Sequence, residues 1–534
     1  MSNISVLCPL FEVIYNPCYR MKRISWSAIG LALLVVIGFL VGYGFYNGRD
    51  RHPDYALNID IKPSATLAQY RAGFAAVKIT PQITETWTDK NNNAYFDKKE
   101  DTFDDRNKNN NFDAVWLAGF QNRRAANTIH DDLWARAMVI DDGQTRIVVV
   151  AVDLIGFTHK NALNVRKRID PKWKIDYSVV CSTHNHEGPD MLGMWGDSFL
   201  ESGVNTEYAL MVEAKVIEAI GQAVGHLQPA RLSVAQDLVG AATLTTDTRL
   251  PLVKDDGLYM LKATDANADT TLGTFVVWGN HPETLWSQNL AITSDFPHYV
   301  REGIEKGVYD GDKLVRKGLG GVAVYATGCV GGLITTSPEV SIKHPFNDQV
   351  FTKPSFEKAE AQGKTIALLM LKALEKTEFI NEKIQLKAQT FEIPLDNPMF
   401  RFGVAMGVLD AGYSSWLKLR TEAAVWTMGQ ASFITIPGEI YPEIVNGGIE
   451  TPADADFNLQ KVVEMPPLRS LMKGKYKFVI GLANDEIGYI IPQSEWDEEA
   501  PHIYGAKEPL YGEINSVGPQ AAPIIHKAIV KMLK

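Results

Sequence analysis

The chain has 534 residues, of which 46% are hydrophobic, 10% aromatic and 22% charged. This composition excludes a disordered or low-complexity chain and supports a sizeable core. The formal net charge of −10 argues against a non-specific nucleic-acid binder, so we expect no nucleic-acid partner. Four cysteines in a chain of this length exclude a disulfide scaffold and a cysteine-rich metal site.

An apolar run without any charged residue spans residues 24–46, which is long enough to cross a bilayer. Trp26 lies at one end of the run and Tyr43 and Tyr46 at the other, where interfacial aromatic residues belong. Basic residues precede the run, at Arg20, Lys22 and Arg23. The pattern predicts an uncleaved signal anchor with a cytoplasmic N-terminus and a periplasmic or extracellular remainder; a cleaved signal peptide is the alternative.

The remaining chain is predicted to hold one large domain. We expect a cytoplasmic tail over 1–23, the transmembrane segment over 24–46, a linker over 47–70 and the catalytic domain over 71–534. Short β-branched runs in the last part alternate with helical patterns, at 207–227 and 364–374 among others. The predicted strands are 146–153, 177–183, 272–278, 322–327, 432–437 and 477–482. This alternation predicts an α/β fold built on a mixed sheet.

Histidines and an acidic residue follow three of these strands directly. His184 and His186 come after the second strand, His281 after the third and Glu439 after the fifth. In extended chain, residues i and i+2 point to the same face, so both histidines of the first pair can reach one site. Side chains at the carboxyl ends of strands mark the usual active-site edge of an α/β sheet, and this set suits zinc. The alternative is that each is an ordinary capping or surface residue.

Residues 72 to about 520 resemble the catalytic domain of the neutral/alkaline, non-lysosomal ceramidase family. The segments that carry the resemblance are 72–81, 135–137, 182–189, 280–282 with 294–295, 436–439 and 481–484. In that family, zinc is held by residues that correspond to His184, His281, Glu439 and Tyr489. Tyr489 follows from the resemblance alone.

Two departures set this chain apart from the family pattern. The family's proposed active-site serine falls on Ile334 or Thr335, and the aspartate of the same segment is replaced by Gly332. The chain also ends about 45 residues past Tyr489, so we expect no counterpart of the C-terminal β-sandwich domain of eukaryotic relatives. The resemblance is therefore to a shorter, divergent member.

The resemblance implies a zinc hydrolase that cleaves the N-acyl amide bond of a lipid-like substrate, in the manner of a ceramidase in sphingolipid metabolism, and the apolar run at 24–46 predicts that it is membrane-anchored. With no serine in place, a zinc-activated water is the expected nucleophile. His186 is the candidate proton shuttle, and Asp295 the candidate residue that orients a ligand. Two alternatives stay open: a zinc hydrolase of another small amide or ester, and a non-catalytic calcium-dependent binding protein. The sequence names no protein partner.

A stretch rich in aspartate and asparagine, residues 89–113, resembles two successive calcium loops. Alternating carboxylate and amide oxygens at this spacing suit Ca²⁺, although Ala94 replaces the usual glycine at the sixth position of the first loop. The candidate ligands are Asp89, Asn91, Asn93, Tyr95 (through its backbone), Asp97 and Glu100, and then Asp105, Asn107, Asn109, Asn111 and Asp113. A solvated polar loop is the alternative.

Cys181 and Cys329 both lie at predicted strand ends near the candidate site. Two buried thiols are the favoured interpretation, and a disulfide is the alternative.

Overall fold

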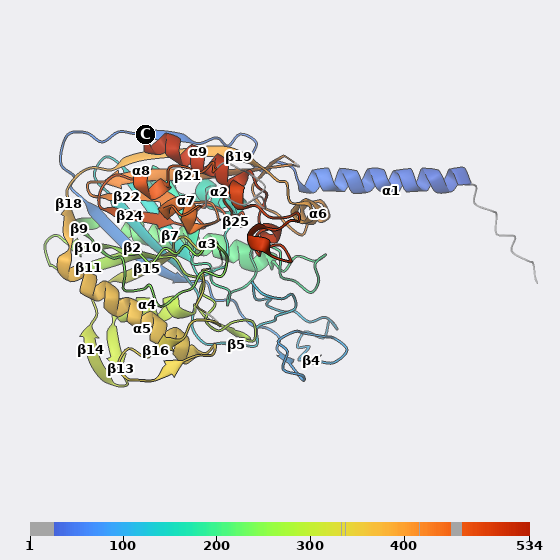
Figure 1. The fold of residues 1–534 in the computed structure, drawn as a ribbon, viewed down its shortest axis with the longest axis horizontal. Coiled ribbons are helices and arrows are strands. Elements are labelled where there is room, and N and C mark those ends of the chain that lie inside the picture. The colour runs from blue at the N-terminus through green and yellow to red at the C-terminus, as the bar shows by residue number, and fades with distance from the viewer. Residues whose placement is uncertain (1–25, 333, 337, 416, 450–461) are drawn as a thin grey trace, which may run out of the picture. The chain divides into compact units, whose positions relative to one another are not determined.

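The computed structural model describes residues 26–534 apart from 333, 337, 416 and 450–461 (Figure 1). Residues up to Tyr43 and residues from Gly44 onward form separate compact units. The first described element is helix α1 (Trp26–Asn47), which carries no charged residue and exposes most of its side chains. Among the described residues, α1 is the one helix that is long and apolar enough to cross a membrane.

The larger of the two main sheets in the second unit has nine strands. Its order is β15 (Val322–Thr327), β11 (Thr271–Trp278), β10 (Leu258–Asp265), β9 (Gln228–Asp237), β2 (Arg71–Lys78), β6 (Trp134–Asp141), β7 (Arg146–Val152) and β8 (Tyr177–Ser182), with β18 (Glu378–Ile380) on β9. The pairs β11–β15 and β7–β8 are parallel and the others are antiparallel. The mixed sheet predicted from the sequence is therefore confirmed.

A second, six-stranded sheet packs against the first. Its order is β1 (Asn58–Ile61), β19 (Gln385–Pro394), β21 (Lys418–Met428), β22 (Ala431–Thr435) and β24 (Tyr476–Ile480), with β20 (Tyr413–Ser415) on β21. Between the sheets lies a core with aromatic residues from both, and the rings of Phe433 and Phe478 stack there at 4.4 Å. Alternate side chains of each strand fill this layer because strand side chains alternate between the two faces.

Helices cover the outer faces of the two sheets, which gives four layers (Figure 1). The first sheet is covered by α3 (Thr206–Gly225), α4 (Phe296–Glu305) and α5 (Phe356–Ala373), and the second by α7 (Pro442–Asn446), α8 (Leu468–Leu471) and α9 (Ala521–Leu533). The described residues of this unit also form α2 (His159–Arg168) and α6 (Pro398–Met406). The smaller strand pairs are β3 (Trp87–Thr88) with β4 (Thr102–Phe103), β5 (Thr128–Ile129) with β12 (Ala291–Ile292), β13 (Gly307–Asp310) with β14 (Lys313–Lys317), β16 (Ile342–Lys343) with β17 (Val350–Phe351), and β23 (Glu439–Ile440) with β25 (Tyr489–Ile490).

The segment 47–70, expected to be a linker, is packed onto the second unit. Strand β1 pairs with β19, and the Arg420 guanidinium binds the Asp50 carboxylate at 3.1 Å. The Tyr55 hydroxyl donates to the buried carboxylate of Glu422 at 2.7 Å, and the Arg166 guanidinium binds both oxygens of that carboxylate. Because these contacts reach a fully buried anion, this segment is part of the fold.

Candidate metal centre

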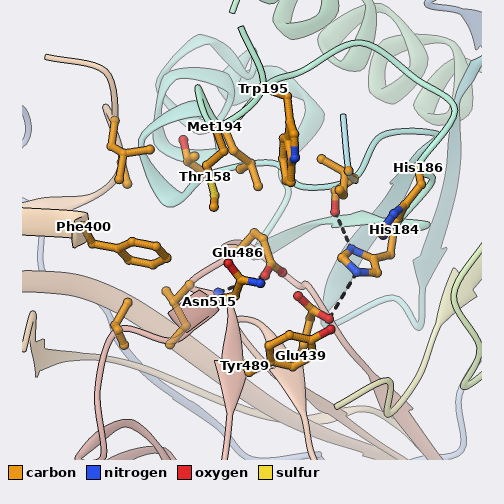
Figure 2. A pocket seen from close by; sticks show the side chains of 18 of the residues that line it. Thr158, His184, His186, Met194, Trp195, Phe400, Glu439, Glu486, Tyr489 and Asn515 are labelled. Carbon is orange, nitrogen blue, oxygen red and sulfur yellow. Dashed lines mark hydrogen bonds and ion pairs between the residues drawn. The ribbon is translucent and has the colours of Figure 1, made fainter. Parts of the chain in front are cut away.

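The four residues that the resemblance assigns to zinc come together at the carboxyl ends of strands from both sheets. His184 lies two residues after β8, and His281 three residues after β11. Glu439 opens β23, which runs parallel to β25 and places Glu439 directly opposite Tyr489. Figure 2 shows Tyr489 beside Glu439, with His184 facing them. All four side chains are buried.

Backbone carbonyls orient both imidazole rings. His184 Nδ1 lies 2.7 Å from the Ile155 oxygen, and His281 Nδ1 lies 2.8 Å from the Ile334 oxygen. A carbonyl only accepts, so Nδ1 carries the proton and Nε2 presents its lone pair. Both Nε2 atoms point at Oε2 of Glu439, at 3.2 Å from His184 and 3.1 Å from His281 (Figure 2 for His184).

This geometry brings three acceptor atoms together. Burial, followed by the neighbouring His184, lowers the pKa of His281 and favours its neutral form. Burial alone would raise the pKa of Glu439, but His184 and His281 outweigh it and lower that pKa, so the carboxylate is ionised. When both imidazoles are neutral, their Nε2 lone pairs and the Glu439 carboxylate form a set of acceptors that a cation between them would satisfy. The donor set therefore fits a metal ion.

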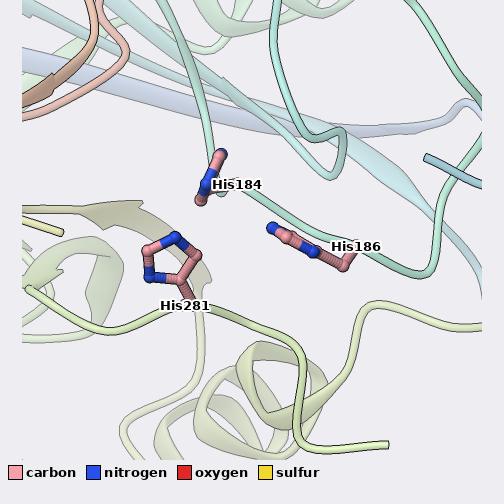
Figure 3. Close-up of side chains that lie close together, drawn as sticks. All are labelled: His184, His186 and His281. Atoms are coloured by element: carbon pink, nitrogen blue, oxygen red, sulfur yellow. The ribbon is translucent and has the colours of Figure 1, made fainter. Parts of the chain in front are cut away.

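A third histidine extends the group, as Figure 3 shows. The metal-binding atoms of His184, His186 and His281 all lie within 4.8 Å of one another. Both ring nitrogens of His186 are buried without a hydrogen-bond partner, and Nδ1 is 3.4 Å from Oε2 of Glu283. Burial, followed by the nearby histidines and Arg124, lowers the pKa of His186 well below its usual value. A neutral imidazole with open nitrogens is a ready ligand or proton acceptor.

Glu283 is a site residue to which the sequence assigned no role. It lines the same pocket, and the Thr335 side chain hydrogen-bonds to its carboxylate. Burial raises the pKa of Glu283 well above its usual value, despite that hydrogen bond. The sequence signal that could have identified Glu283 is its position two residues after His281.

A buried ion pair supports the loop that carries His184 and His186. Arg124 and Glu187 are both fully buried and lie 3.1 Å apart, and the Arg124 guanidinium also donates to the carbonyl oxygens of His186 and Ala118. His184 itself has a positive φ of 65°, a conformation that costs a non-glycine residue energy and recurs at functional sites. Nothing in the spacing of the sequence pointed to Arg124.

Asp295, expected to orient a ligand, has other hydrogen-bond partners. Its carboxylate accepts from the backbone of Phe296, which opens α4, and of Leu285. The His281 ring is oriented instead by the Ile334 carbonyl, so Ile334 contributes through its backbone. Asp295 thus holds the turn after His281 rather than the imidazole.

The candidate metal ligands His184, Glu439 and Tyr489 lie at the polar end of a pocket of about 490 Å³. Most of its remaining lining is apolar. Phe400, from α6, lies at the opposite end of the pocket from His184 and His186, and Met194 and Trp195 lie along one side (Figure 2). A mostly apolar cavity with a few convergent polar groups is the usual form of a site for a small organic molecule.

The two calcium-loop segments adopt one and the same turn. In each, the first aspartate (Asp89 or Asp105) accepts two backbone N–H groups four and five residues later. In each, the fourth and sixth positions have positive φ, including 55° at Ala94. Asn91 donates to Glu100 in the first loop. The other candidates, Asn93, Tyr95, Asp97, Asn107, Asn109, Asn111 and Asp113, lie on the same two exposed or half-buried turns.

Cys181 and Cys329 are buried free thiols, as favoured from the sequence. The disulfide alternative is not present.

The fold and the site together define a mixed α/β protein with a buried histidine group, able to hold a metal, at the end of an apolar pocket. No family model and no curated protein matches the chain. Among solved structures, it is similar to a neutral ceramidase from Pseudomonas aeruginosa, with a TM-score of 0.61 and 16% identity over 87% of this chain and 74% of that one. A ceramidase complexed with C2 gives the same TM-score, identity and coverage of this chain, over 75% of its own length. The ceramidase-like fold expected from the sequence is thereby confirmed.

Proposed function

We propose that the protein is a membrane-anchored, zinc-dependent hydrolase that cleaves an N-acyl amide bond of a lipid-like substrate. The observation that carries the proposal is the convergence of His184 Nε2 and His281 Nε2 on one oxygen of Glu439, at 3.2 and 3.1 Å. Two buried imidazoles and a carboxylate are the ligand types of catalytic zinc sites. The ceramidase-like fold agrees with this reaction class.

The proposed ligands are His184, His281, Glu439 and Tyr489. A zinc ion held there would supply a water of lowered pKa and polarise the scissile carbonyl. His186 Nδ1 and Glu283 Oε2, 3.4 Å apart, are the pair placed to accept and return a proton at this end of the pocket.

The shape of the pocket supports a lipid-like substrate. The amide would lie at the histidine end, and an acyl chain would run toward Phe400 along the apolar wall. Burying each methylene of such a chain contributes about 0.8 kcal/mol. Helix α1 would hold the enzyme at the membrane where such substrates reside, with its N-terminus cytoplasmic and the catalytic unit outside.

The proposal is tested on the full chain purified in detergent. We expect about one zinc per chain by mass spectrometry and turnover of a fluorogenic N-acyl amide, with both lost in His184→Ala. The control is His226→Ala, which removes an exposed histidine at the C-terminal end of α3. Zinc without turnover of amides of any chain length would redirect the proposal to another small amide or ester, and a chain without zinc would refute it.

We also propose that the two turns of 89–113 bind calcium and thereby fix one wall of the pocket. The first turn is joined to that wall, because the Phe96 N–H donates to the Arg123 oxygen at 3.0 Å and the Gln121 amide donates to the Ala94 oxygen at 3.1 Å. Phe120, in the same segment as these partners, lines the pocket. Titration of the full chain with calcium in an isothermal calorimeter tests this proposal. The absence of any binding heat would refute it.

A further inference from the structure

Helix α6 carries an apolar face that is exposed to solvent. Met399, Phe402 and Met406 are 57%, 45% and 38% exposed, and their spacing of three and four residues places them on one side of the helix. On the other side, Phe400 lines the pocket and Val404 is buried. The helix therefore separates the pocket from an unpartnered apolar surface.

Two further exposed apolar residues belong to segments near the pocket. Ile514, 63% exposed, is joined to the start of the helix because the capping residue Asn397 donates to its carbonyl oxygen at 3.0 Å. Phe199, 64% exposed, belongs to the loop that carries Trp195 of the pocket wall. We call Phe199, Met399, Phe402, Met406 and Ile514 the apolar rim. Each rim residue belongs to a segment that also contributes a residue to the pocket lining: Phe400 in α6, Trp195 near Phe199 and Asn515 beside Ile514.

The end of the apolar helix α1 is fastened to this same helix. Asn47, its last residue, donates from Nδ2 to the Ala405 oxygen at 3.0 Å, and Gly44 and Gly48 are buried. The 22 residues of α1 span about 33 Å, which matches a hydrocarbon core of about 30 Å. When α1 crosses a membrane, Asn47 emerges at the lipid–water interface and holds α6 there.

We propose that the apolar rim inserts into the outer interface of the membrane that α1 crosses, so that substrate enters the pocket directly from the lipid phase. The occupant of this surface is a bilayer, because the chain itself delivers α6 to one. Apolar helix faces of this kind lie about 5–10 Å deep at the headgroup boundary. This inference rests on the membrane anchoring in the proposed function.

The test measures depth in the membrane and does not depend on catalysis. In the full chain with Cys8 and Cys18 changed to serine, an environment-sensitive fluorophore is attached at Phe402→Cys. The matched control is Phe379→Cys, which replaces a 65% exposed phenylalanine on β18, at the far end of the catalytic unit from α6 (Figure 1). The two remaining cysteines are buried. In phosphatidylcholine vesicles that carry doxyl-labelled lipids, we expect strong quenching at 402 and none at 379.

Equal quenching at both positions, or none at 402, would overturn the proposal. A spectral change at 402 that follows protein concentration and not doxyl lipid would assign the surface to a second copy of the chain and would also overturn it. A chain with quenching at 402 but no amidase activity would retain the docking and lose the proposed reaction. An active chain without quenching at 402 would retain the proposed reaction and overturn the docking.

A kinetic measurement gives a second readout. Phe402→Asp should raise the apparent KM for an N-acyl amide embedded in vesicles by about tenfold, since it removes apolar burial at the interface. Turnover of a short-chain amide in detergent should stay at the wild-type value, because Phe402 does not line the pocket. Equal loss on both substrates would refute docking as the cause.

Discussion

Replacing Gly119 by alanine should displace His186 and lower turnover. The added Cβ would lie 2.4 Å from His186 Nδ1 and 2.9 Å from its Cγ, well inside van der Waals contact. The ring or its loop must then move by about 1 Å. His186 is buried against Phe120, so this movement changes the position of Nδ1 relative to Glu283, which lies 3.4 Å from it in the wild type. A misplacement of that size at a reacting group costs about a hundredfold in kcat/KM.

A second glycine separates the effect of backbone strain from the effect of the collision with His186. Gly119 has φ of 79°, so alanine also strains the chain by about 1–2 kcal/mol. Gly143 has φ of 82° with open space around its Cβ position, and Gly143→Ala carries the strain without the collision. We would compare kcat/KM for an N-acyl amide, zinc content and melting temperature in both variants. Equal activity in the two would refute the role of His186.

Four further outcomes follow from the contacts described above. Glu439→Gln should lower zinc affinity more than tenfold, measured by competition with a chelating dye, because the anion between the two imidazoles is lost; unchanged affinity would remove Glu439 from the ligand set. Glu422→Gln should cost about 3–5 kcal/mol, since it breaks a buried ion pair. Burial alone would raise the pKa of Glu422, but the ion pair lowers it well below 4.5. In the wild type the stabilisation is therefore present above pH 4.5 and is lost as the pH falls toward the folded pKa. The melting temperature of the variant should depend less on pH between about 7 and 3. Asp89→Ala should abolish part of the calcium-dependent rise in melting temperature, and an unchanged rise would contradict the loop assignment. Burial raises the pKa of Cys181 to about 12, so it and Cys329 should react with a thiol reagent only after unfolding, and fast labelling of the native chain would contradict their burial.

The sequence predicted the buried strands of the nine-stranded sheet well because they are short, β-branched and buried on both faces. The expected strand 322–327 matches β15, and 177–183 matches β8 to within one residue. Helix α3 (Thr206–Gly225) matches the helical pattern expected at 207–227 to within two residues, and Asn205 caps it. Helix α5 begins earlier than expected, since Ser355 caps it and its first turns bury polar residues that hide the apolar pattern.

Strand-end motifs predicted part of the site, and tertiary contacts determined the rest. His184 and His281 are recognisable because each follows a strong strand signal. Arg124 is distant in sequence from the loop that it supports, and Ile334 acts through its carbonyl, which any residue possesses. No side-chain pattern reports such contacts. The packing of 47–70 was missed for a related reason: its polar residues pair with buried charges that only the fold brings near.

The candidate metal centre joins the two sheets of the sandwich. His184 and His281 extend from the nine-stranded sheet, whereas Glu439 and Tyr489 follow strands of the six-stranded one. The distances among them therefore depend on how the sheets lie against each other. The core between the sheets determines this, because Tyr259 and Phe275 of the nine-stranded sheet contact Phe478 of the six-stranded one. Because such cores are close-packed and do not deform freely, sliding between the layers is resisted. The aromatic core between the sheets thus fixes the distances among the candidate ligands. A substitution in this core should lower the affinity for metal before it prevents the chain from folding.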